Sequence, residues 1–109
     1  MQFYQERVIR TLNRLEVAFN EIIKENDPGR ITMERDNDRL VVSVKRIGDY
    51  TFSSDDGTQT FSLQSPESGI HMYKYDEVQG FWKSMQQEHI LEELLVREFC
   101  HHSRGLLDL

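Results

Sequence analysis

Cysteine is nearly absent from this 109-residue sequence, which contains Cys100 alone. An internal disulfide is therefore excluded, and with it the class of small secreted proteins that disulfides hold together. Long apolar runs are also missing, since no stretch approaches the roughly 20 apolar residues that cross a bilayer. We therefore expect no membrane partner. We expect no signal peptide, because a basic start followed by an apolar stretch is missing. We also expect a folded helix and not a transit peptide at the start, because Glu6, Glu16 and Glu21 lie among its basic residues.

Basic residues are the second shortage, with 13 Lys and Arg against 19 Asp and Glu and a net charge of −6. Nucleic acid is not expected as a partner, because phosphate backbones bind clustered Lys and Arg and here these residues are scattered. An acidic protein attracts cations or basic protein surfaces, but a charge of this size also serves solubility alone. Charge leaves both interpretations open.

The length fits a single domain over residues 1–109, and a hydrophobic content of 38% is enough to bury a core without disulfides or structural metals. The first apolar residues are spaced by four, three, four and three positions, as on one face of an α-helix. This pattern predicts a helix from near Phe3 to just before Pro28, which cannot continue it. The apolar residues of this face are Val8, Leu12, Leu15, Phe19 and Ile22.

The middle of the chain changes to the two-residue period of β-strands, beginning with Leu40, Val42 and Val44. Short connections predict that consecutive strands pair antiparallel. Helical spacing returns from Glu88 to Phe99. The pattern predicts an α+β fold, a two-layer α/β sandwich with both helices on one face of a five- to six-stranded antiparallel sheet. The expected strands lie near 31–33, 40–44, 50–52, 61–63, 72–75 and 81–82.

Catalytic motifs are lacking: no serine lies in a strand–turn–helix elbow, and no Gly-rich loop could hold a phosphate. The run Cys100-His101-His102 contains three metal-ligand residue types. Adjacent residues at a helix end point in diverging directions, however, which favours a solvated helix end over a shared metal site. Its role is left open.

Several features occur in an order that resembles the frataxin family. They are the turn Ser65-Pro66-Glu67-Ser68-Gly69, an aromatic residue at Tyr73, Trp82 in the next strand, and a closing helix with Leu91-Glu92-Glu93-Leu94-Leu95. Each motif is weak by itself, but together they cover roughly Phe3 to Phe99. The chain resembles a divergent frataxin of the eukaryotic type.

The resemblance implies an accessory protein of iron–sulfur cluster assembly that contacts and activates a cysteine desulfurase–scaffold complex. It also implies weak iron binding by exposed carboxylates, here Glu21, Glu34 and Asp36, which are suitable oxygen ligands. By the same resemblance we expect a monomer in a mitochondrion or a mitochondrion-derived organelle, with the cytosol left open. The expected role is that of a regulator, not an enzyme, although a weak ferroxidase is one alternative.

At the surface positions that carry function in the family, most residues of this chain differ from the family pattern. Of the helix positions that match the acidic ridge, only Glu21 is acidic; the others are Ile9, Arg10, Asn13, Val17, Asn20 and Lys24. Ser62 replaces an exposed Trp. By alignment, the expected partner contacts are Ser53, Gln59, Thr60, Ser62, His71 and Met72. These departures favour a frataxin with a co-diverged partner, and the alternative is a protein-binding module of the same fold without iron chemistry.

Overall fold

The computed structural model describes residues 2–102, 107 and 109, and it contains a helix, six strands and a second helix. The strands form one sheet whose spatial order follows the chain, and all neighbours are antiparallel. The expected antiparallel meander is therefore confirmed. The elements are α1 (Gln2–Glu25), β1 (Ile31–Arg35), β2 (Arg39–Val44), β3 (Gly48–Asp55), β4 (Thr60–Ser65), β5 (Gly69–Asp76), β6 (Phe81–Ser84) and α2 (Leu91–His102).

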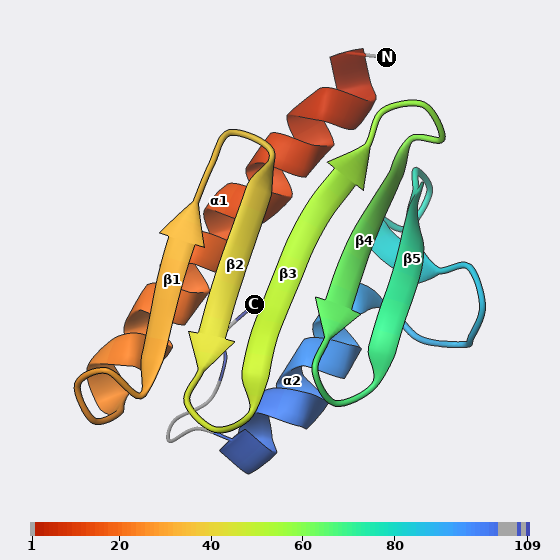
Figure 1. Ribbon diagram of the computed structural model, residues 1–109. Helices are drawn as coiled ribbons and strands as arrows, with labels where there is room; N and C mark the ends of the chain where they lie inside the picture. Colours follow the sequence, from red (N-terminus) through yellow and green to blue (C-terminus); the bar gives the residue numbers. More distant parts are fainter. Residues whose placement is uncertain (1, 103–106, 108) are drawn as a thin grey trace.

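Both helices lie behind the sheet on the same face, as Figure 1 shows, and the two-layer α/β sandwich is confirmed. The alternation of strand side chains explains this arrangement, because successive residues point to opposite faces. In β2, Leu40, Val42 and Val44 are buried, whereas Val41 and Ser43 between them are half-buried. One face of the sheet therefore belongs to the core, and the other is open to solvent.

The helix α1 ends where the sequence changes from helix formers to turn residues. The Asn26 side chain donates to the Ile22 carbonyl at 2.7 Å and so satisfies one of the last carbonyls of the helix. Pro28 then prevents continuation, and Gly29 adopts a φ of +82°, which favours glycine. Over the described residues, neither helix is long and apolar enough to span a bilayer.

The helix α2 begins at Leu91, three residues after the predicted Glu88. The Ile90 amide donates to the Glu93 carboxylate at 3.0 Å, which is half of a capping box and fixes the helix start. Before it, residue Ile90 bridges Lys83 of β6, so this segment extends the sheet instead of the helix. His89, in the same segment, is buried.

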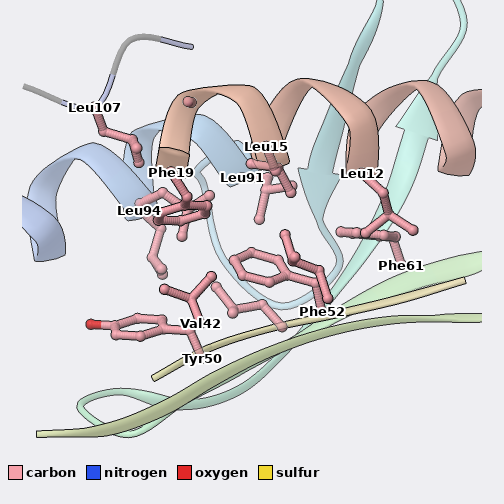
Figure 2. Close-up of a cluster of buried hydrophobic side chains, with 14 of the residues drawn as sticks. Leu12, Leu15, Phe19, Val42, Tyr50, Phe52, Phe61, Leu91, Leu94 and Leu107 are labelled. Atoms are coloured by element: carbon pink, nitrogen blue, oxygen red, sulfur yellow. The ribbon is translucent and has the colours of Figure 1, made fainter. Parts of the chain in front are cut away.

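The core lies between the two helices and the inner face of the sheet. Figure 2 shows Leu15 and Phe19 of α1 pointing toward Phe52 and Val42 of the sheet, with Leu94 of α2 beside them. Aromatic rings link the layers: Phe19 contacts Phe52 at a centroid distance of 5.9 Å and Phe99 at 5.0 Å. Burial of these side chains is the main source of stability.

A buried hydrogen bond ties α1 to the last strand. The indole N–H of Trp82 donates to the Thr11 hydroxyl at 2.7 Å, and both residues are buried. We expect Thr11→Val to lower the free energy of unfolding by roughly 1–3 kcal/mol, because the indole N–H loses its partner inside the core. Urea unfolding measures the loss. Thr11→Ser keeps the hydroxyl and is the matched control; equal stability of the Val variant and the wild type would contradict the assignment.

Candidate functional site

The open face of the sheet brings three of the predicted partner residues into one cross-strand row. Ser53 of β3 is paired with Ser62 of β4, and Ser62 is paired with Met72 of β5. All three are half-buried, and the two serine hydroxyls lie 2.9 Å apart. Hydroxyls of this kind contact a partner through hydrogen bonds, and the Met72 thioether adds an adaptable apolar contact. We call Ser53, Ser62 and Met72 the open-face row.

Other predicted partner residues lie elsewhere, and two of them are buried. Gln59 is half-buried in the β3–β4 turn with a φ of +55°. Thr60 is 2% exposed, and its hydroxyl lies 2.8 Å from that of Thr58 in the same hairpin. His71 is 7% exposed and points to the helix side of the sheet, opposite to Met72, because adjacent strand residues alternate. Direct partner contact by the side chains of Thr60 and His71 does not fit this burial.

Basic side chains flank the open-face row on both sides. Arg39 of β2 is paired with Ser53 and is exposed. Lys74 of β5 and Lys83 of β6 are paired and exposed on the same face. The same face carries the exposed acids Glu34 and Asp49 toward β1, so charge on it is mixed. A central row of small hydroxyls with basic neighbours suits contact with a polar protein surface.

The three predicted iron ligands do not come together. Glu21 is on α1, where it forms an ion pair with Lys24 at 3.4 Å. Glu34 is exposed on β1, with its side chain on the open face opposite to the partly buried Met33. Asp36 follows β1 in the loop. Within the described residues, no group of three His, Cys, Asp or Glu is arranged to hold a metal ion.

Asp36 lies at a shallow groove between α1 and the β1–β2 loop, with a volume of about 700 Å³. The groove is also lined by Asp38 and Glu16, so three carboxylates lie near one basic side chain. Arg35 lines it and binds Glu16 of α1 at 2.9 Å. Arg35 therefore neutralises the Glu16 carboxylate, which is one of the three carboxylates at this edge.

Cys100 is exposed near the end of α2, and its thiol donates to the Arg97 carbonyl at 2.9 Å. The side chains of His101 and His102 lie outside the described part of the structure. A shared metal site for Cys100-His101-His102 is therefore not tested and stays an open hypothesis.

A polar cluster that the sequence analysis did not anticipate lies on the helix side of the sheet. Its centre is Glu98 of α2, which is only 5% exposed. Its carboxylate accepts hydrogen bonds from Tyr50 at 2.9 Å, Ser65 at 2.7 Å and Ser68 at 2.5 Å. Figure 2 shows the Tyr50 hydroxyl pointing away from the apolar core. Burial would raise the pKa of Glu98, but hydrogen bonds, with Ser68 foremost, outweigh it and lower that pKa.

The Ser65–Gly69 turn owes its shape to the same cluster. The Ser65 hydroxyl accepts hydrogen bonds from the amides of Glu67 and Ser68, both at 3.1 Å. Pro66 packs against the neighbouring β2–β3 turn, where a Cβ on Gly48 would lie 2.7 Å from the Pro66 Cβ. Gly48 is therefore required by close approach. The turn thus connects β4 and β5 to α2 through the hydrogen bonds of its serines to Glu98.

Two histidines complete the cluster. His71 of β5 lies 2.8 Å from the Ser68 hydroxyl through Nε2, and His89 lies 2.9 Å from the Tyr73 hydroxyl. The two imidazole rings are edge-to-face with centroids 5.5 Å apart. Burial lowers the pKa of His89, and the neighbouring His71 lowers it further. Burial likewise raises the pKa of Tyr73.

A signal for this cluster is present in the sequence. Glu98 follows Leu94 by four residues and Leu95 by three, so it occupies the apolar stripe of its helix. A carboxylate at such a position needs hydrogen-bond donors in the folded protein. The serines of the turn are these donors, which explains why Ser65 and Ser68 occur there.

The architecture and sequence of this chain are similar to those of known proteins. A family model described as the frataxin-like domain matches residues 1–104. No curated protein sequence matches the chain significantly.

Solved structures of similar fold include two of trimeric frataxin from the yeast Saccharomyces cerevisiae. One, described as complexed with ferrous iron, has a TM-score of 0.80 at 19% identity and covers 91% of this chain and 87% of its own. The other, with a full-length N-terminus, has a TM-score of 0.78 at 20% identity and covers 88% and 78%. Frataxin from Psychromonas ingrahamii has a TM-score of 0.69 at 14% identity and covers 95% of both chains. Because the family model covers nearly the whole sequence, this chain belongs to the frataxin-like family.

Proposed function

We propose that this protein is an accessory factor of iron–sulfur cluster assembly that binds a cysteine desulfurase–scaffold complex. The observation that carries the proposal is membership of the frataxin-like family over residues 1–104. The location proposed with this role is a mitochondrion or a mitochondrion-derived organelle, and the chain is proposed to act as a monomer. The yeast relatives are trimeric.

The open-face row is the proposed contact surface. Its side chains are accessible from the face that neither helix covers, and Ser53, Ser62 and Met72 are held in register by backbone pairing. A rigid strand surface loses little conformational entropy on binding, which favours a defined complex. The proposed role is to position and activate the partner, not to perform chemistry on the sheet.

Iron binding is proposed as weak and without a resident site. Glu21, Glu34 and Asp36 lie on three different segments and do not fit one ion together. A ferroxidase needs a defined ligand set, so these separate carboxylates do not support that activity. We therefore propose that iron is a transient cargo, bound by single exposed carboxylates.

A paramagnetic titration tests this view of iron. Substoichiometric Mn²⁺ should broaden amide signals in two patches, one near Glu21 and one around Glu34 and Asp36, because the carboxylates do not share one ion. Replacing all three by Gln or Asn should remove the broadening. Asp49→Asn, on an exposed carboxylate outside these patches, is the control. Broadening centred on Cys100 to His102 would contradict the carboxylate assignment and identify the helix end as the site.

A second candidate function is a protein-binding module without iron chemistry. The dispersed carboxylates favour it, since the described chain lacks a group of three ligands. Binding to the purified desulfurase–scaffold complex from the source organism separates the two functions. Saturable binding with faster sulfur transfer supports the accessory role. Absence of binding, with the folded protein confirmed by circular dichroism, would reject it in favour of the module.

A further inference from the structure

The polar cluster beneath the sheet joins elements that are far apart in the chain. His71 and Tyr73 belong to β5, His89 belongs to the segment before α2, and Glu98 belongs to α2. Met72, a member of the open-face row, lies between His71 and Tyr73 in the sequence of β5. His71 and Tyr73, whose side chains lie on the helix side of the sheet, therefore flank Met72, whose side chain lies on the open face.

Counting protons fixes part of the hydrogen-bond pattern. Each hydroxyl has one proton to donate, and the Ser68 proton goes to the Glu98 carboxylate. The Ser68 oxygen must then accept from His71, so His71 carries a proton on Nε2. The result is a chain of hydrogen bonds from His71 through Ser68 to Glu98, which joins β5 to α2.

His89 is poorly placed to carry a second proton. It is 8% exposed, and a cation there would lie against the His71 ring and near Arg97, with Glu93 as its acidic neighbour. Burial is the largest effect disfavouring the charged form. The groups around the cluster come from every element packed on it: Tyr50, Glu67, His71, Tyr73, Glu92, Glu93, Arg97 and Glu98.

We propose that His71 and His89 form an acid-sensitive clasp between β5 and the segment preceding α2, and that protonation of His89 loosens β5 and with it Met72. The clasp consists of His71, Ser68, Glu98, Tyr73 and His89. Its effect on partner binding rests on the proposed function, whereas the loosening itself is a property of the isolated protein.

The direction with pH follows from linkage. Because the pKa of His89 is lowered in the folded protein, its contribution to stability is complete above the unfolded value of about 6.5 and is lost as the pH falls through that value toward the folded pKa. Glu98 acts in the same direction at lower pH, since its lowered pKa stabilises the fold until that carboxylate is protonated. His89 is therefore the trigger in the mildly acidic range.

Amide hydrogen exchange of the whole protein tests the clasp. On going from about pH 7.5 to about pH 5.5, protection of the Met72–Lys74 amides should fall about tenfold after correction for intrinsic exchange, whereas β1–β2 amides should change little. His89→Gln keeps a hydrogen-bonding group but cannot titrate, so the fall should disappear. Glu88→Gln, one residue away and exposed, should retain it.

Two results would overturn the proposal: no fall in the wild type, or an equal fall in His89→Gln. If that variant does not fold, His71→Gln decides, because removing the neighbouring imidazole removes one cause of the lowered pKa of His89 and should reduce the fall. An unchanged fall in His71→Gln would also overturn the clasp. Binding at both pH values is measured separately. Lack of binding at either pH counts against the proposed function, whereas the exchange data judge the clasp.

Discussion

Leu15→Ala is expected to lower the free energy of unfolding by about 2–5 kcal/mol, because it removes a large side chain from a packed core. Leu15 is 1% exposed, and Figure 2 places it between α1 and the sheet, close to Leu91. Leu15 belongs to a buried cluster that contains side chains from both helices and from the sheet. Chemical denaturation with intrinsic fluorescence from the buried Trp82 measures the change.

Val17→Ala is the matched control, since Val17 is on the same helix but 65% exposed. Its effect should stay within about 0.5 kcal/mol, as for surface substitutions generally. An unchanged free energy of unfolding for Leu15→Ala, or equal losses for the two variants, would show that the inner face of α1 has been assigned wrongly.

Ser62→Trp is expected to weaken binding to the native desulfurase–scaffold complex by about 2 kcal/mol, roughly thirtyfold in Kd. Ser62 bonds to the Ser53 hydroxyl at 2.9 Å, and an indole at this position would stand in the middle of the open-face row. A partner that has co-diverged with Ser62 has no space for the ring. Thr32→Trp, which adds the same ring to the exposed edge strand β1, is the control.

The opposite result is equally informative. If the partner surface has kept a pocket for the family's aromatic residue, Ser62→Trp should strengthen binding to a generic eukaryotic complex. Isothermal titration with both complexes separates these cases. No change with either complex would mean that the open-face row is not the interface, and the contact surface proposed above would be withdrawn.

Local patterns were sufficient to predict the architecture. The stripe from Val8 to Ile22 predicted α1, and the alternation of Leu40, Val42 and Val44 predicted both a strand and its buried face. These predictions succeeded because backbone periodicity and burial agree in this fold. The start of α2 was misplaced because the helical spacing continues back through a segment that pairs with β6 instead.

The candidate site was less predictable, because alignment to a family does not carry side-chain direction. His71 and Met72 were both assigned to the partner surface, although neighbouring residues of a strand point to opposite faces. Glu98 was overlooked because charged residues are usually exposed, and its compensating hydroxyls come from a turn and a strand remote in sequence. Likewise, spacing cannot show whether Glu21, Glu34 and Asp36 meet in space.

The chain-order arrangement of the sheet has a consequence for how the molecule folds. Every strand pairs with its immediate successor, so each pairing closes a short loop and contributes contacts of low sequence separation. The contacts of greatest sequence separation are instead made by the helices, such as that between Thr11 and Trp82, 71 residues apart. The sheet can therefore assemble one hairpin at a time, whereas cooperativity across the molecule depends on α1 docking against strands synthesised long after it.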